Sequence, residues 1–215
     1  MKKLILTTLA AALCAGLVAC KDKTPAPQAG TASAATTAPA TEAASAAPAQ
    51  ASAVQAPASV AKDIYSMAGQ AHGFAVGQMM AANTVYVFFD PTCPHCAEFW
   101  KASKDAHSKV KMVWIPVSLL RDDPGPKGAT ILSAADPVAK MEENETKVLS
   151  GAGGIEVPAD VSKAALDEVK ANTEIFSKLE ARSVPFIVYK NAQTGQAGTH
   201  AGGMPATELL TLIGL

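Results

Sequence analysis

Two cysteines, Cys93 and Cys96, have two residues between them in the run FFDPTCPHCAEFW. Residues three positions apart on a helix share one face, so the two sulfur atoms can approach to the distance that a disulfide requires. The first turn of a helix also presents free N–H groups, which favour a thiolate at Cys93. The spacing therefore predicts a redox-active pair, with Cys93 as the nucleophile and Cys96 as the cysteine that resolves a mixed disulfide.

The two residues between the cysteines are expected to tune the thiolate. Pro94 fits the first helical position, where the N–H group that proline lacks is not needed. His95 stands near the same helix terminus and can add positive charge or a hydrogen bond that favours the Cys93 thiolate. A more stable thiolate stabilises the reduced protein, so the disulfide becomes a stronger oxidant.

The elements that position the cysteines are a strand before them and a helix after them. The apolar run at 84–89 predicts a buried strand, and Asp90-Pro91 marks the turn that follows it. Pro116 restricts a second strand, at 111–117, to a sheet edge or a strand end. Further elements are predicted as helices at 60–71, 93–108 and 205–213, strands at 73–77, 185–190 and 196–200, and a mostly helical stretch at 119–181. This order predicts an α/β, thioredoxin-like fold with an inserted helical subdomain at about 119–181.

The helical stretch divides into three helices with their own start signals. Apolar residues recur at helical intervals in 128–135, 137–149 and 162–181. Asp136-Pro137 is typical of a cap followed by a first helical residue, and Asp160 or Ser162 can cap the last helix.

The N-terminus has the features of a targeting segment. Lys2 and Lys3 precede an apolar core at 4–18, and Leu17-Val18-Ala19-Cys20 resembles the lipobox of bacterial lipoproteins. That resemblance implies a signal peptide at 1–19 and a lipidated Cys20; the alternative is an ordinary secretory signal. Both interpretations place the protein in the periplasm, an oxidising compartment. In the bacterial lipoproteins that this segment resembles, aspartate directly after the lipidated cysteine favours retention in the inner membrane. Lys21 stands there in this sequence, so the resemblance implies the outer membrane.

Residues 20–59 consist mainly of Ala, Pro, Ser and Thr. Recurring prolines interrupt any helix that the alanines start, and without large apolar residues the segment cannot bury enough surface to fold. We expect a disordered tether that holds a thioredoxin-like domain, residues 60–215, near the membrane.

The remaining composition excludes several classes of protein. Of four cysteines, Cys14 lies in the signal peptide and Cys20 is expected to carry lipid, so no framework of structural disulfides is available. No basic cluster indicates nucleic-acid binding. No H-x₃₋₅-H pair supports zinc, and Ala97 after the second cysteine excludes a c-type haem site. We expect no metal and no cofactor beyond the Cys93–Cys96 disulfide, but a copper-binding, non-enzymatic lipoprotein remains the alternative from another class.

Four stretches together resemble the catalytic domain of the periplasmic DsbG/DsbC disulfide isomerases, and DsbG more than DsbC. They are YVFFDPTCPHCAEFW, ILSAADP, VPADVS and SVPFIVY. The resemblance implies a thiol:disulfide interchange enzyme that acts on protein clients and exchanges electrons with a DsbD-like or DsbB-like membrane partner. It also implies a cis-proline at Pro185 facing the disulfide, with the Val184 backbone pairing with an extended client chain.

Three departures from that family bear on the mechanism. The dimerisation domain of the isomerases has no counterpart in this sequence, so we expect a monomer. The dipeptide Pro94-His95 between the cysteines is the one found in the oxidase DsbA. Val184, before the presumed cis-proline, also matches DsbA, whereas DsbG and DsbC have threonine at that position. Val87 occupies the place, six residues before Cys93, where thioredoxin and DsbA carry a buried carboxylate; Asp90 and Glu98 are the candidates to replace it. The direction stays open between donating disulfides and reducing or isomerising them, or rescuing sulfenic acids.

Overall fold

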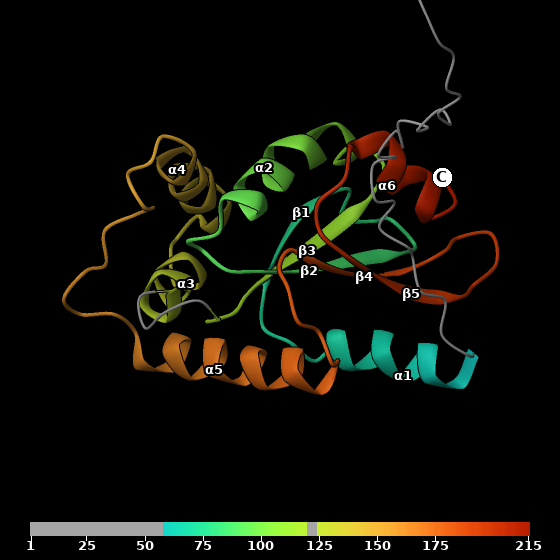
Figure 1. Cartoon of the computed structure of the whole chain (residues 1–215), viewed down its shortest axis with the longest axis horizontal. Helices are drawn as coiled ribbons and strands as arrows, with labels where there is room; N and C mark the ends of the chain where they lie inside the picture. The colour runs from blue at the N-terminus through green and yellow to red at the C-terminus, as the bar shows by residue number, and fades with distance from the viewer. Residues whose placement is uncertain (1–57, 120–123) are drawn as a thin grey trace, which may run out of the picture. The chain divides into compact units, whose positions relative to one another are not determined.

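A computed structural model describes residues 58–119 and 124–215 (Figure 1). The predicted signal peptide (1–19), the lipidation site Cys20 and the predicted tether up to residue 57 lie outside the described residues. Helix α1 (Ala58–Ala68) begins two residues before the predicted start of the domain. Within the described part of the chain, no helix is both long and apolar enough to span a bilayer.

A five-stranded mixed sheet forms the centre of the domain, with the strands in the order β1-β3-β2-β4-β5. Strand β2 runs parallel to β3, and the other neighbouring strands are antiparallel. Pro116 is the last residue of β3 and pairs with Phe89, so the prediction that it stands at a strand end is confirmed. The strands are β1 (Phe74–Gly77), β2 (Thr84–Phe89), β3 (Lys111–Pro116), β4 (Phe186–Lys190) and β5 (Ala197–Ala201).

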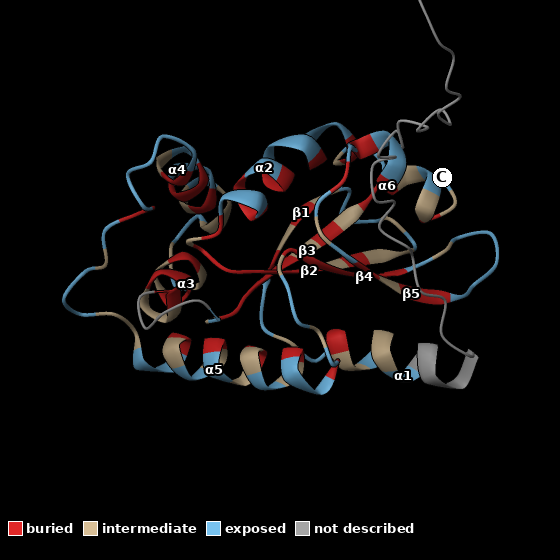
Figure 2. Cartoon of the chain, in the orientation of Figure 1, coloured by how far each residue is buried: buried red, intermediate tan, exposed pale blue. Residues whose placement is uncertain are grey.

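Both faces of the sheet contribute buried residues, and the strands are drawn in red and tan in Figure 2. Along β2, Val85, Val87 and Phe89 join one core cluster, which also holds Cys96. Phe88 points the other way and packs with Phe176 in a second cluster. This alternation follows from the two-residue period of a strand.

Helices cover the two faces of the sheet in separate groups. Helices α2 (Pro94–Ser103) and α6 (Ala206–Leu212) lie on one face, and α1 and α5 (Lys163–Lys178) lie on the other (Figure 1). Helices α3 (Pro124–Leu132) and α4 (Pro137–Leu149) complete the insertion between β3 and β4, where α4 packs against α2. The element order is the one that the sequence predicts, and the thioredoxin-like fold with inserted helices is confirmed.

The helix after the cysteines is shorter than predicted. It ends at Ser103 and continues as a 3₁₀ turn at Lys104–Ala106, whereas the sequence predicts a helix to about residue 108. The Ser103 hydroxyl donates a hydrogen bond of 3.0 Å to the Trp100 carbonyl oxygen. A serine that bonds to the backbone in this way competes with the helical ladder, and helices often tighten to 3₁₀ geometry at their ends.

Candidate active site

The two cysteines lie in the first turn of α2, at the point where β2 ends. Cys93 caps the helix with extended backbone angles (φ −86°, ψ 116°), and Pro94 occupies the first helical position. The backbone N–H groups of Cys96 and Ala97 donate to the Cys93 carbonyl oxygen at 3.1 and 3.2 Å. Both thiols are free, so the structure describes the reduced pair.

The two thiols have opposite electrostatic properties. A hydrogen bond from the Cys96 thiol lowers the pKa of Cys93 to about 6, with further backbone hydrogen bonds from Cys96 and His95, although burial opposes the shift. Burial raises the pKa of Cys96 far above its ordinary value, because its side chain is completely enclosed. The site can therefore present a thiolate at Cys93 and keep a protonated thiol at Cys96 near neutral pH.

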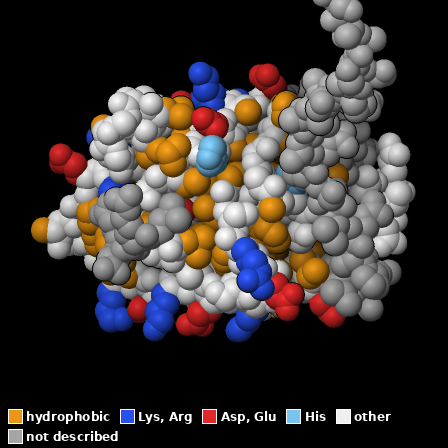
Figure 3. All heavy atoms as spheres, viewed as in Figure 1, with side chains coloured by type: hydrophobic (Ala, Val, Ile, Leu, Met, Phe, Trp, Pro, Cys, Tyr) orange, Lys and Arg blue, Asp and Glu red, His pale blue; other side chains and the backbone are white. Residues whose placement is uncertain are grey.

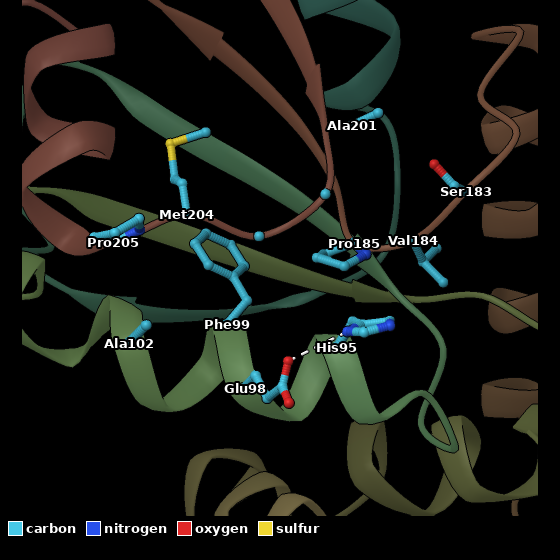
Figure 4. Close-up of a pocket in the computed structure, with 12 residues that line it drawn as sticks. His95, Glu98, Phe99, Ala102, Ser183, Val184, Pro185, Ala201, Met204 and Pro205 are labelled. Atoms are coloured by element: carbon cyan, nitrogen blue, oxygen red, sulfur yellow. Dashed lines mark hydrogen bonds and ion pairs between the residues drawn. The ribbon is translucent and has the colours of Figure 1, made fainter. Parts of the chain in front are cut away.

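His95 stabilises the Cys93 thiolate through its backbone N–H group and not through its ring. Its N–H group supports the Cys93 thiolate, as the lowered pKa of Cys93 reflects. Its exposed ring pairs instead with Glu98, with 3.2 Å between Nδ1 and Oε2 (Figure 4). Pro94 is exposed beside it.

Val184 and Pro185 lie beside the cysteines, although they are about ninety residues away in the sequence. The Val184–Pro185 peptide bond is cis, as the resemblance implies. The Sγ atom of Cys93 lies 3.9 Å from the Val184 carbonyl oxygen, within reach of a weak hydrogen bond. An open groove of about 570 Å³ borders this contact on the α2 side, and its lining includes His95, Phe99, Pro185 and Met204 (Figure 4).

Neither predicted replacement for the missing carboxylate is a free buried acid. Val87 is fully buried in the core, on the face of β2 that also holds Val85 and Phe89. Asp90 is buried, but its Oδ1 accepts from the backbone and hydroxyl of Thr92, and its Oδ2 accepts from the Leu119 N–H at 3.1 Å. Asp90 therefore joins the active-site turn to the start of the insertion. Glu98 is exposed.

Glu145 is a buried carboxyl group that interacts electrostatically with Cys93 and Cys96 and that no sequence motif singled out. Its side chain is 1% exposed, and burial raises its pKa to about 8. Met141, Asn144, Glu145 and Val148 are the buried residues of α4, at the helical spacing of an inward face. In the sequence, Glu145 stands at helical spacing from Met141 and Val148, and a glutamate in line with apolar residues is the signal that could have located this buried acid.

Asn144 fastens α4 to the active-site turn. Its Nδ2 donates to the Pro91 carbonyl oxygen at 2.8 Å, and its Oδ1 accepts from the Ile155 N–H at 3.0 Å. Gly154 has φ +97°, and a Cβ atom there would lie 2.6 Å from Asn144 Oδ1. Glycine is therefore required at this close approach.

We predict that Cys96→Ala raises the pKa of Cys93 by one unit or more, to about 7–8, because it removes the thiol that contributes most to the shift. The ultraviolet absorbance of the thiolate, followed against pH, measures this value. His95→Ala is the matched control: it keeps the backbone N–H group and should change the pKa much less. An equal or larger shift in His95→Ala would show that the ring, not Cys96, stabilises the thiolate.

Within residues 58–119 and 124–215, no group of three or more His, Cys, Asp or Glu side chains is arranged to hold a metal ion.

Comparison with known proteins agrees with this geometry. The family model described as thioredoxin matches residues 70–200, which is more than half of the chain. The chain belongs to the thioredoxin family. Within that family, the match begins near the end of the α1 region and includes both cysteines and the cis-proline.

Curated relatives include two proteins called thiol:disulfide interchange protein DsbG. The one from Pseudomonas aeruginosa is 29% identical over 160 residues, with 73% of this chain and 61% of the relative covered. The one from Escherichia coli K12 is 28% identical over 164 residues, with 72% and 64% covered. The chain thus spans less than two thirds of the length of either relative.

Among solved structures, the catalytic domain of Proteus mirabilis ScsC has the same fold. Its TM-score is 0.54 at 16% identity, with 72% of this chain and 94% of that domain covered.

Proposed function

We propose that this protein is a thiol:disulfide oxidoreductase that exchanges disulfides with protein clients through Cys93 and Cys96. The observation that carries the proposal is the Cys93 thiol, whose pKa is lowered to about 6 and whose sulfur lies 3.9 Å from the Val184 carbonyl oxygen at the edge of a groove. The similarity to two thiol:disulfide interchange proteins supports the same reaction.

The reaction runs through a mixed disulfide. The Cys93 thiolate attacks one sulfur of a client disulfide, the client disulfide breaks, and a client thiolate leaves. Cys96 then attacks Cys93 Sγ, which forms the Cys93–Cys96 disulfide and releases the second client thiolate. The client gains two electrons and the cysteine pair loses two. In the reverse direction, a client thiolate attacks Cys93 of the oxidised pair, and the client becomes oxidised.

The groove lined by His95, Val184 and Pro185 suits an extended client segment. Pro185 precedes β4, and the Val184 backbone lies next to the attacking sulfur. Backbone pairing at this position would align a client sulfur with Cys93, as when a peptide adds a strand. Apolar groups such as Phe99 and Met204 favour client segments with an apolar side chain near the cysteine.

For the direction, donation of disulfides is the first candidate. A lowered Cys93 pKa stabilises the reduced form and so makes the oxidised form a stronger oxidant. The second candidate is a DsbG-like reductase or isomerase, or a protein that rescues sulfenic acids; the relatives called DsbG favour it.

One experiment tests both the function and its direction. Oxidised protein is mixed with a reduced, unfolded client, and the client thiols are counted with Ellman's reagent; we expect each chain to remove two client thiols. Equilibration with glutathione then gives the potential. A value near that of DsbA, about −120 mV, supports donation, whereas one near that of thioredoxin, about −270 mV, supports reduction. A chain that exchanges no thiols but holds one copper ion would instead support the metal-binding alternative.

The proposal extends to where the protein acts. We place the protein in the periplasm, as a monomer that is held at the outer membrane by lipid on Cys20. Its proposed redox partner is a DsbD-like or DsbB-like membrane protein. Membrane fractionation and light scattering test these points. Recovery with the inner membrane would refute the choice of membrane, and a dimer in solution would refute the oligomeric state.

A further inference from the structure

The carboxyl group of Glu145 is buried in the domain without the contacts that usually stabilise a buried acid. Its Oε1 accepts one hydrogen bond of 3.2 Å from Asn144 Nδ2. Its Oε2 has no hydrogen-bond partner among the described residues, and the side chain is 1% exposed. A carboxyl group in such a place disfavours its charged form and costs stability. A role in the chemistry of the site explains why an acid is retained here.

The position of Glu145 connects it to both cysteines. Helix α4 packs against α2, and a hydrogen bond of 2.6 Å from Trp100 Nε1 to Glu142 Oε2 joins the two helices. The adjacent residue, Asn144, holds the Pro91 carbonyl oxygen, two residues before Cys93. Glu145 interacts electrostatically with Cys93, and Cys96 in turn experiences the charge of Glu145.

The other ionisable groups around Glu145 are mostly acidic. Asp90 on the turn after β2 and Glu142 on α4 itself both disfavour a negative charge on Glu145. The cysteines approach from α2, and α3 contributes the buried cation Lys127 beside Gly154. Burial raises the pKa of Glu145 to about 8, with smaller contributions from the charges of Cys93, Asp90 and Glu142, so that the group can gain and lose a proton near neutral pH.

We propose that the Glu145 carboxylate accepts the proton of the Cys96 thiol when Cys96 attacks the mixed disulfide, and returns that proton when the exchange runs backwards. The inference rests on the proposed disulfide exchange and assigns one of its proton transfers. In the forward step the S–H bond of Cys96 breaks, the Cys93–Cys96 bond forms, the bond from Cys93 to the client breaks, and the client leaves as a thiolate. The proton stays on Glu145 until it passes to solvent.

Cys96 needs such an acceptor because it is completely buried and its pKa is strongly raised. Its proton has no direct exit to water, and a thiol is a far weaker nucleophile than a thiolate. Val87 supplies no carboxylate, Asp90 is engaged with Thr92 and Leu119, and Glu98 lies exposed beside His95. The inserted helix α4 thus supplies the acid that β2 lacks.

The test follows the two steps separately with an aromatic disulfide such as Ellman's reagent. The reduced chain releases one aromatic thiolate when Cys93 attacks and a second when Cys96 resolves the mixed disulfide. In Glu145→Gln we expect the second release to slow by about 100-fold at neutral pH. We expect the first release to stay within about threefold of the wild-type rate, because removing an acceptor for Cys96 leaves the Cys93 nucleophile in place.

The pH profile separates proton transfer from a merely structural effect. In the wild type the second release should rise with a midpoint near pH 8 and then level off, whereas in Glu145→Gln it should rise in proportion to hydroxide. Glu145→Asp should restore part of the rate. Glu143→Gln, on the exposed side of the same helix, is the matched control and should leave both releases unchanged.

The outcomes are distinguishable from those of the proposed function. If the wild type shows no first release, the disulfide exchange itself is refuted. If the first release is normal and Glu145→Gln keeps the wild-type rate and profile of the second, the role of Glu145 is refuted. Should the glutamine variant fold poorly, the wild-type profile alone decides: a rise in proportion to hydroxide, without a plateau, contradicts the proposal.

Discussion

Replacing Cys93 by serine is expected to lower the rate of disulfide exchange by about 10³-fold or more, because a hydroxyl group cannot act as the thiolate nucleophile. The fold should tolerate the change, since Cys93 is the cap of α2 and serine is a favoured cap residue. Reduction of insulin and oxidation of a reduced client measure the loss, and circular dichroism checks the fold.

Cys96→Ser is the matched variant and should fail in a different way. Cys93 can still attack a client, but no second thiol resolves the product, so covalent complexes with clients should accumulate. Non-reducing gels followed by mass spectrometry detect them. Complexes that accumulate in Cys93→Ser but not in Cys96→Ser would reverse the assigned roles of the two cysteines.

Glu145→Gln is expected to increase the free energy of unfolding of the reduced protein, by an amount that grows with pH. The pKa of Glu145 is raised from 4.5 to about 8 in the folded state, so between these values the folded protein binds a proton that the unfolded chain has lost. Wild-type stability therefore falls as the pH rises through this window. The gain of the variant should grow from about zero below pH 4.5 to a plateau on the order of 5 kcal/mol above pH 8.

Urea denaturation at a series of pH values measures this difference. Cys93 titrates in part of the same window and interacts with Glu145, so the comparison is made in the Cys93→Ser background, where that titration is absent. Glu143→Gln provides the control: the pKa of Glu143 is lowered to about 2 by its bonds to Lys140 and Lys147, so its effect should be constant above pH 5. A pH-independent difference for Glu145→Gln would mean that the carboxyl group is not held in its neutral form.

Local sequence patterns predicted the parts of the domain that short-range physics determines. The strand, turn and helix around the cysteines follow from an apolar run, Asp90-Pro91 and a proline at the first helical position. The caps of α4 and α5 are also local: Asp136 accepts from the Ala139 N–H, and Ser162 accepts from the Ala165 N–H. Such features need no knowledge of the rest of the chain.

Features that depend on tertiary packing cannot be predicted from local sequence patterns. The spacing of α4 indicates which side of the helix faces inward, but not that this side meets α2 and the cysteines. Glu145 therefore stayed hidden among the charged residues of its helix. For His95 the sequence predicts added charge or a hydrogen bond to the thiolate but not which group supplies it: the structure has a hydrogen bond from the His95 backbone and pairs the ring with Glu98, one turn further along α2.

The bond between Asn144 and Pro91 also determines which positions can vary without changing the active site. Gly154 lies 58 residues beyond Cys96, yet any side chain there would press on the amide that holds the active-site turn. Substitution at Gly154 is thus restricted by its contact with Asn144, while the exposed neighbour Ala152 carries no such restriction; Gly153 (φ +78°) favours glycine only for its own backbone conformation. An engineer who shortens the loop after α4 must keep this one glycine in register with Asn144, or the cysteine pair loses its support.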